Sequence, residues 1–456
     1  MSSSSAPARQ TTRASLLLLA YLAFVSLGLP DGLLGVGWPS IRSEFTVPTE
    51  AVGLLLTSGT VGYLVSSVVA GFSIARLGVG WLLAGSTALA SLALTGYASS
   101  PALPVMIGCA LLLGLGSGAI DAGLNAYAAG AFGPRHMNWM HACFGLGVAI
   151  GPLVMTTALS AGLSWRWGYG VVAGAQAVLA LAFVLTAGTW TSRRPVDGPP
   201  GHPADPATAD PATVLTPPLA EPTGEAGRQE EPAVRDASAT GPTGGPVRIR
   251  ETLAIPAVWF GALTFAMYVA IEVAAGLWAF LLLTEARGMT AATAGLCVSL
   301  YWGSLFVGRV VQGVLAERLG TRLTLLGSMV GMLVGAGLLA VPGPGWLAVT
   351  GLAVLGFGAA PVFPLLTLTT ADRVGRRHAD RAIGVQIGAA ALGGALIPAG
   401  LGVLIGRTSV AALGPALVVA AIVMLVLYWA SRRPGPTGVR PGDTRDAGGP
   451  GPRPAS

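Results

Sequence analysis

Hydrophobic residues are gathered into twelve long stretches of the chain, separated by short polar segments. Each stretch has 18 or more residues, and about 20 residues of α-helix cross the hydrocarbon core of a bilayer. The pattern therefore predicts an all-α membrane protein with twelve transmembrane helices. The expected helices cover residues 14–38, 50–75, 79–99, 102–128, 137–162, 166–189, 254–284, 291–316, 322–342, 345–369, 380–406 and 411–431.

Two polar segments divide the chain into parts. Residues 190–250 are rich in Pro, Gly, Ala, Thr and Glu and almost lack aromatic residues, so they cannot bury a core. We interpret this segment as a flexible cytoplasmic linker between two six-helix halves, residues 1–189 and 251–433. Residues 434–456 have a similar composition and are expected to form a disordered tail.

Charged residues are scarce, and this scarcity excludes several classes of protein. Only 10% of the residues are charged, against roughly 25% in soluble domains, and Lys is absent. This composition excludes a water-soluble enzyme, a disordered protein and a nucleic-acid-binding domain, whose basic residues must lie on a wet surface. The three cysteines lie inside apolar stretches at no metal-ligand spacing, so we expect no metal and no other cofactor.

The positions of the arginines predict the orientation of the helices. If the N-terminus lies inside, sixteen arginines near helix ends fall in cytoplasmic segments and only four in outer loops. This bias follows the positive-inside rule and fits an even number of spans. We therefore expect a protein of the cytoplasmic membrane with both termini inside. The four outer arginines are Arg42, Arg166, Arg287 and Arg407.

The two halves repeat each other at an offset of 242 residues. At this offset, residues 71–78 (GFSIARLG) align with residues 313–320 (GVLAERLG). Residues 114–116 (GLG) fall on residues 356–358 (GFG) in the same way. Both copies begin on the same side of the membrane, so the sequence predicts two parallel six-helix repeats.

The loop at residues 313–322, GVLAERLGTR, resembles the signature loop of the major facilitator superfamily. The resemblance implies that superfamily's fold, with the loop between the second and third helices of a half. Charges at helix ends there can form a latch that favours one access state; the alternative is that the arginines only anchor the topology. Arg309, which precedes the loop, is expected to have a structural role and either to snorkel to the inner face or to pair with an acid. The implied gating residues are Gly313, Glu317, Arg318, Gly320 and Arg322, with Arg76 in the first-half copy, where Ala75 replaces the acid.

A second resemblance concerns the middle of the first half. Residues 121–125 (DAGLN), 137–141 (MNWMH) and 145–152 (GLGVAIGP) are similar to the branch that contains the fucose- and glucose-type sugar symporters. Those carriers use an acid in the first helix and another in the fourth for sugar and proton. Asp31 and Asp121 lie in the matching helices of this chain, so the resemblance implies a role for both.

Three acids lie well within predicted spans: Asp31, Asp121 and Glu272. A charge at the bilayer centre costs about 2.5–3.5 kcal/mol, so each is a candidate for contact with solute or proton. Asp31 follows Pro30, and we expect a broken first helix with Asp31 facing a cavity; the alternative is that the helix ends at Leu29. Glu272 falls one residue from Asp31 at the repeat offset and is expected at a similar height.

Other polar residues extend this candidate site. Asp121 and Asn125 are four residues apart and share a helix face. His141 lies at a comparable depth in the next helix, which makes an Asp121–His141 proton relay the preferred reading and a static hydrogen bond the alternative. Gln176 and Gln386 are weaker candidates, because their amides can hydrogen-bond a hydroxylated ligand.

These features predict a secondary transporter that carries a small solute by alternating access. The second resemblance implies a sugar-like solute but does not fix the substrate. Titratable residues in the spans favour coupling to protons, and coupling to Na⁺ is the alternative. The expected partners are the solute, the coupling ion and the lipid bilayer, with no nucleic acid, and the chain is expected to be a monomer and not an enzyme. Two alternatives stay open: a proton-driven antiporter that exports drugs or metabolites, and a membrane sensor that binds a ligand without transport.

Overall fold

The computed structural model describes residues 6–132, 134–190 and 249–432, without the side chains of 6–13, 134–135, 138 and 312–317. Nearly all of the predicted linker and the whole tail lie outside these residues. The helices are α1 (Ala6–Phe45), α2 (Val52–Ser99), α3 (Leu103–Ala131), α4 (Pro134–Ser160), α5 (Trp165–Thr186), α6 (Ile249–Leu253), α7 (Pro256–Leu281), α8 (Ala291–Leu319), α9 (Thr321–Ala340), α10 (Gly345–Ala359), α11 (Val362–Leu368), α12 (Thr370–Val374), α13 (Ala379–Arg407) and α14 (Leu413–Ser431). A π-helical turn, Leu282–Ala286, extends α7.

The described ranges contain eleven continuous helical stretches that are long and apolar enough to cross a bilayer. One of them, Thr49–Ser99, has 51 residues and holds two spans, because Gly78 interrupts α2 with φ 76° and ψ 160°. Glycine adopts a positive φ without steric cost, so the chain can turn here between two spans. The prediction of an all-α protein with twelve spans is therefore confirmed.

The backbone conformation repeats at the same offset as the sequence. Gly78 and Gly320, which are 242 residues apart, both follow a helix end with a positive φ, of 76° and 81°. Thr46 and Gly288 are also 242 residues apart and have φ values of 55° and 64°. Because a non-glycine residue at positive φ is uncommon, Thr46 indicates that the repeat preserves the turn itself and not only the residue type.

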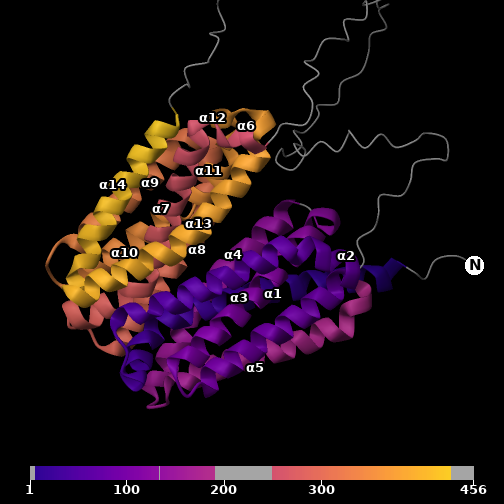
Figure 1. Cartoon of the computed structure of the whole chain (residues 1–456), viewed down its shortest axis with the longest axis horizontal. Coiled ribbons are helices and arrows are strands. Elements are labelled where there is room, and N and C mark those ends of the chain that lie inside the picture. The colour runs from indigo at the N-terminus through magenta and orange to yellow at the C-terminus, as the bar shows by residue number, and fades with distance from the viewer. Residues whose placement is uncertain (1–5, 133, 191–248, 433–456) are drawn as a thin grey trace, which may run out of the picture.

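Helices α1–α5 form one bundle and α7–α14 form a second bundle beside it (Figure 1). Within the first bundle α1 packs on α4, and α2 packs on α3 and α5; within the second, α7 packs on α13 and α14. The bundles meet mainly through α4 with α8, through α2 with α13 and through α1 with α7. Following the predicted orientation, we call the end that carries Thr46 and Gly288 the outer end, and the end that carries Gly78 and Gly320 the inner end.

The two bundles are joined at the outer end. A Cβ placed on Gly53 at the start of α2 would meet the Cβ of Ala399 in α13. Arg42 and Glu285, near the ends of α1 and of the π-helical turn, form an ion pair with an Nη2–Oε1 distance of 3.3 Å. Toward the inner end the bundles diverge, and α6, α12 and the beginning of α1 lie apart there (Figure 1).

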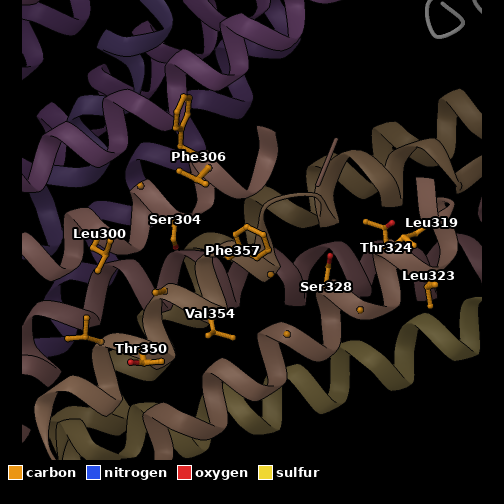
Figure 2. A pocket seen from close by; sticks show the side chains of 17 residues that line it. Leu300, Ser304, Phe306, Leu319, Leu323, Thr324, Ser328, Thr350, Val354 and Phe357 are labelled. Carbon is orange, nitrogen blue, oxygen red and sulfur yellow. The ribbon is translucent and has the colours of Figure 1, made fainter. Parts of the chain in front are cut away.

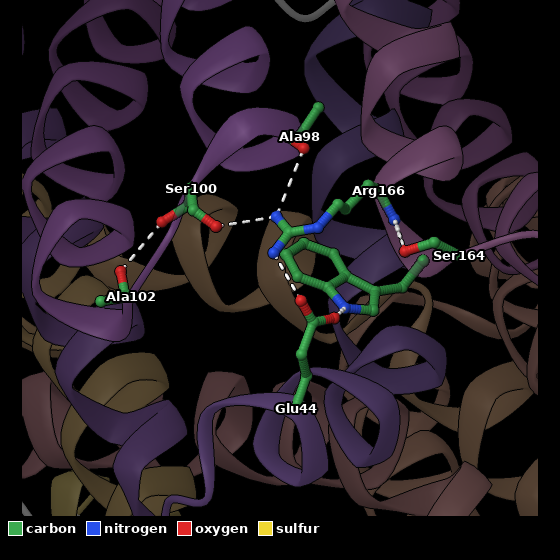
Figure 3. A network of polar contacts seen from close by, with 7 residues as sticks. Glu44, Ala98, Ser100, Ala102, Ser164 and Arg166 are labelled. Atoms are coloured by element: carbon green, nitrogen blue, oxygen red, sulfur yellow. Dashed lines mark hydrogen bonds and ion pairs between the residues drawn. The ribbon is translucent and has the colours of Figure 1, made fainter.

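Arg166 at the start of α5 ties together the outer end of the first bundle (Figure 3). Its Nη1 donates to the carbonyls of Ala98 (3.3 Å) and Ser100 (2.8 Å), where the second span of α2 ends. Its Nη2 donates to Glu44 Oε1 at 2.6 Å, and Trp165 Nε1 donates to Glu44 Oε2 at 2.6 Å. The carbonyls at a helix C-terminus carry partial negative charge, so a cation stabilises them.

Arg287 stabilises the carbonyls of a helix end at the outer end of the second bundle. It donates to the carbonyls of Leu339 (2.9 Å), Val341 (2.8 Å) and Gly343 (3.2 Å), at the outer end of α9. Of the four outer arginines, Arg166 and Arg287 thus satisfy helix ends, and Arg42 forms the ion pair between the bundles. These roles explain why arginines occur on the side that the positive-inside rule disfavours.

Helices α1 and α4 approach closely through glycines. A Cβ on Gly147 would meet the Val25 backbone carbonyl, and a Cβ on Gly151 would lie 2.8 Å from the Gly32 Cα atom. A Cβ on Gly28 would likewise meet the backbone of α4 at Phe144. Small residues permit such contacts between membrane helices, so the Gly147–Gly151 pair has a packing role.

The expected break of the first helix at Pro30 is wrong, because α1 runs without interruption from Ala6 to Phe45. A proline lacks the N–H that would bond to the carbonyl four residues earlier, here that of Ser26. Gln176 of α5 replaces this donor: its Nε2 donates to the Ser26 carbonyl at 3.1 Å. The helix therefore continues because a neighbouring helix satisfies the free carbonyl.

Replacing Gln176 with Leu should leave the Ser26 carbonyl buried without a donor. We expect the variant to lose about 1–2 kcal/mol of unfolding free energy, the typical cost of an unsatisfied buried polar group. Thermal or denaturant unfolding of the purified protein measures this change. Adding Pro30→Ala restores a backbone donor to Ser26, so most of the loss should be recovered; a double variant as unstable as Gln176→Leu alone would contradict this assignment.

Candidate functional site

The Asp121 carboxylate in α3 is held by two donors. The hydroxyl of Tyr63 in α2 donates to Oδ2 at 2.7 Å, and Nδ2 of Asn125, one turn further along α3, donates to Oδ1 at 3.0 Å. All three side chains are half-buried. The shared helix face of Asp121 and Asn125 was predictable from their spacing. Tyr63 was not selected from the sequence. Tyrosines of membrane helices usually lie at the membrane–water interfaces, so a tyrosine in the middle of a span could have indicated a polar contact inside the protein.

Asp31 and Glu272 occupy matching positions in α1 and α7. Each lies four residues before a glycine, Gly35 or Gly276, and these glycines touch: a Cβ on Gly35 would lie 2.9 Å from the Gly276 carbonyl oxygen. Residues four apart share a helix face, so both acids face the interface between the bundles, directly inside its outer closure. The Asp31 side chain is exposed and that of Glu272 is half-buried.

Two tyrosines surround Glu272. Tyr268 lies one turn earlier on the same face of α7, and its buried hydroxyl lies near the carboxylate. Tyr301 of α8 donates its hydroxyl proton to the backbone carbonyl of Glu272 at 2.8 Å. These contacts fix the position of α7 along the helix axis relative to α8, and therefore also the position of the Glu272 carboxylate.

Arg309 of α8 connects the two bundles. Its Nη1 donates to the backbone carbonyl of His141 in α4 at 3.2 Å. The guanidinium is also close enough to act electrostatically on the Glu272 carboxylate and on the His141 ring. The sequence left open an anchor at the inner face or a pairing with an acid, and the structure places this arginine between the halves, near Glu272.

His141 is exposed, and its ring packs edge-on against Phe24 of α1 with centroids 5.3 Å apart. Asp121 acts on His141 electrostatically. Among the described residues no direct hydrogen bond joins the two side chains, and Asp121 is bonded to Tyr63 and Asn125 instead. A proton relay between Asp121 and His141 would therefore need a bridging water or a small movement.

We call Asp31, Asp121, His141, Glu272 and Arg309 the interface charge cluster. It contains three carboxyl groups, one guanidinium and one imidazole, contributed by α1, α3 and α4 of the first bundle and α7 and α8 of the second. Acids outnumber permanent cations, so the cluster can take up protons or bind polar groups of a ligand. Within the described ranges, no group of three or more His, Cys, Asp or Glu side chains is suited to hold a metal ion.

The two glutamines lie inside their own bundles in this conformation. Gln176 is 1% exposed and bonded to Ser26, and Gln386 is 1% exposed, with Oε1 accepting from Thr370 Oγ1 at 2.9 Å. The amide nitrogen of Gln386 packs against Gly261 of α7. Neither amide can contact a solute without repacking, so we assign both to helix packing.

The signature loop lies at the inner end, between α8 and α9. Arg318 and Arg322 are exposed, and Gly320 makes the turn with its positive φ. The side chains of Gln312 to Glu317, and so the gating candidates Gly313 and Glu317, are outside the described residues. In the first-half copy, Arg76 is exposed and lies over the Phe72 ring at 4.0 Å from the centroid.

The sequence profile described as Major Facilitator Superfamily matches residues 20–398 and 258–450. The 3-(3-hydroxy-phenyl)propionate transporter of Escherichia coli (strain K12) is 28% identical over 162 residues. This alignment covers 35% of the chain, which spans 40% of the length of that curated relative.

Solved structures with the same fold are also found. A variant of the nucleoside transporter NupG has a TM-score of 0.67 and 15% identity, over 92% of this chain and 98% of that one. A bacterial homologue of the human lysosomal transporter Spinster, in an inward-facing and unoccupied conformation, has a TM-score of 0.63 and 14% identity, over 94% and 96%. The profile match extends over most of the chain, and the twelve spans form two bundles. The chain therefore belongs to the major facilitator superfamily and is a membrane transporter of small solutes, not an enzyme.

Proposed function

We propose that this transporter works by alternating access and couples the movement of a polar organic solute to protons. The observation that carries the proposal is the interface charge cluster, in which acids from both bundles and the bridging Arg309 converge between the halves. Carriers with parallel repeats bind their solute near the bilayer midplane between the halves. A solute held there touches both bundles, so its binding can change their relative position.

The arrangement of the bundles supports an inward-facing state. The outer end is joined by Gly53 with Ala399 and by the Arg42–Glu285 ion pair, whereas the inner ends diverge (Figure 1). The Spinster homologue of similar fold was itself captured inward-facing. In the outward-facing state the outer contacts must separate, and the inner ends with their signature loops must approach each other.

Asp121 is the proposed site of proton binding. Its carboxylate accepts hydrogen bonds from Tyr63 and Asn125, and it acts electrostatically on His141. Protonation removes the charge and turns one acceptor oxygen into a donor, so one of these two hydrogen bonds must reverse or find another partner. A change of charge at this depth therefore alters the contacts between α2, α3 and α4, which is the property that coupling requires.

The first candidate solute is a sugar-like molecule, as the resemblance of residues 121–152 suggests. Carboxylates such as Asp31 and Asp121 are good acceptors for sugar hydroxyls. A second candidate is a hydroxylated aromatic acid. It is favoured by Arg309, which can bind a carboxylate, and by the 28% identity to a 3-(3-hydroxy-phenyl)propionate transporter over part of the chain.

A ligand screen followed by flux measurements tests this proposal. Purified protein is heated with L-fucose, D-glucose, uridine, 3-(3-hydroxyphenyl)propionate and hydrophobic cations, and a ligand raises the melting temperature by mass action. The ligand that does so is then followed in proteoliposomes with an imposed pH gradient. Uptake driven by an inward proton gradient supports symport, and export driven by it supports the antiporter alternative. Binding without flux in either direction would contradict the transport proposal and favour a sensor.

A further inference from the structure

A groove runs along the second bundle outside the interface between the halves (Figure 2). It encloses a cavity of about 1050 Å³ and is lined by α8, α9 and α10. On α8, the lining residues Leu300, Ser304 and Val307 lie on one face, whereas Arg309, which touches α4, lies on the opposite side. Phe306 lines the edge of the groove that is nearer to the first bundle (Figure 2). The groove therefore opens away from the first bundle, toward the surroundings of the protein, which in a membrane are lipid.

The side chains that line the groove are mostly apolar and can pack against a hydrocarbon chain. Leu300, Val307, Leu319 and Leu323 are at least half exposed, although large exposed apolar surfaces are unusual where water is the solvent. Three of the four hydroxyl groups on its wall already donate to the backbone of their own helix or its cap. The Ser304 hydroxyl donates to the Tyr301 carbonyl (2.7 Å), that of Thr324 to the Gly320 carbonyl (3.1 Å) and that of Thr350 to the Trp346 carbonyl (2.9 Å). The groove thus offers few hydrogen bonds to a sugar or another polar solute.

The length of the groove matches the bilayer. Its lining on α8 extends from Leu300 to Leu319, which is roughly 28 Å at 1.5 Å per residue, close to the thickness of the hydrocarbon core. Two glycines of its wall, Gly303 and Gly327, have nothing within 4 Å of a Cβ placed on them. The wall is therefore open where these glycines lie, which leaves room for a chain-like ligand.

The inner end of the groove carries positive charge. Arg318 precedes the lining residue Leu319 and lies eleven residues after Val307, three helical turns along the same face of α8. Arg322 precedes the lining residue Leu323 in the first turn of α9, and both arginines are exposed. Basic residues at the cytoplasmic ends of grooves between membrane helices attract anionic lipid headgroups.

We propose that the groove between α8, α9 and α10 binds an anionic phospholipid, with an acyl chain along the groove and the phosphate at Arg318 and Arg322. Bound in this way, the lipid would bridge α8, which contacts the first bundle, to α9 next to the signature loop. This site is separate from the interface charge cluster, so it does not depend on which solute is transported.

Native mass spectrometry of the purified full-length protein tests the proposal. Delipidated protein is titrated with phosphatidylglycerol or with phosphatidylcholine of the same acyl chains. We expect the first phosphatidylglycerol to bind roughly tenfold more tightly than phosphatidylcholine, because two arginines face its headgroup. Arg318→Gln with Arg322→Gln should remove this preference. Equal affinity of the wild-type protein for the two lipids would overturn the proposal.

A glycine variant tests the position of the acyl chain. Gly327→Leu should fill the inner part of the groove and weaken the binding of both lipids. Gly337→Leu is the matched control, because it lies on the same helix outside the groove and also has nothing within 4 Å of its Cβ position. The proposal fails if Gly327→Leu binds phosphatidylglycerol like the control. Loss of solute flux with unchanged lipid binding would also overturn it and would place the groove on the solute pathway.

Discussion

A disulfide between residues 53 and 399 is expected to stop transport completely. The variant carries Gly53→Cys and Ala399→Cys in a background in which Cys109, Cys143 and Cys297 are replaced by Ala. A Cβ on Gly53 would lie 2.5 Å from the Ala399 Cβ, so the two helices must part by about 1 Å to accommodate a disulfide. The bond then joins α2 of one bundle to α13 of the other. Because the outer ends must separate in each cycle, oxidation should reduce solute flux in proteoliposomes to the background level, and a reducing agent should restore it.

A disulfide within one bundle is the matched control. Gly96 lies beside Cys109, and a Cβ on Gly96 would be 3.5 Å from the Cys109 Cβ, within the normal range for a disulfide. Gly96→Cys, with Cys109 retained and the other two cysteines replaced, links α2 to α3 inside the first bundle. This bond should leave flux intact. If the oxidised 53–399 variant, shown to be cross-linked by its gel mobility, transports as fast as its reduced form, the outer end does not open during transport.

The fold follows from the sequence because a bilayer allows few alternatives. Backbone polar groups must be satisfied within each span, so twelve apolar stretches can only be twelve helices. The ends of the helices were less predictable. The first span was expected to end at residue 38, but α1 continues to Phe45, since Arg42 and Glu44 find charged partners at the outer end. Their partners are distant in sequence, so a local pattern does not reveal the extension.

The break expected at Pro30 failed for a similar reason. A proline frees one carbonyl, and a local pattern cannot tell whether another helix will bind it. Gln176 does so here, and the same residue was interpreted from the sequence as a ligand-binding side chain. A buried amide can serve a neighbouring backbone as well as a solute, and only the packing of α5 on α1 distinguishes these roles.

The candidate site was predictable in part. The acids in the spans stand out because a buried charge is costly, and the repeat offset paired Asp31 with Glu272 before their positions were known. The links between them are tertiary contacts: Tyr63 to Asp121, and Arg309 across to α4. The position of Arg309 along its predicted span could be read from the sequence. The direction in which its side chain points depends on how the two bundles pack together, and no pattern within one helix reveals this.

Asp121→Asn is expected to abolish accumulation of the solute while leaving exchange intact. With a pH difference of about one unit across the membrane, symport of a neutral solute with one proton sustains roughly tenfold accumulation, because one pH unit is worth 1.36 kcal/mol. Asn keeps the shape of the side chain and can still accept from Asn125. Its amide N–H can donate to the Tyr63 hydroxyl, which then accepts, but the side chain cannot take up a proton. Proteoliposomes with an acidic exterior should therefore equilibrate the solute and not concentrate it, whereas counterflow of labelled for unlabelled solute continues.

Tyr63→Phe separates the proton site from the packing around it. This variant removes the 2.7 Å hydrogen bond to Asp121 but keeps the carboxyl group, so it should still concentrate the solute. If coupling depended only on the geometry of α2 and α3, Tyr63→Phe would fail and Asp121→Asn would succeed. Accumulation by Asp121→Asn equal to that of the wild-type protein, with unchanged dependence on pH, would exclude Asp121 as the coupling residue and direct attention to Asp31 and Glu272, the two acids that face the interface beside the outer closure.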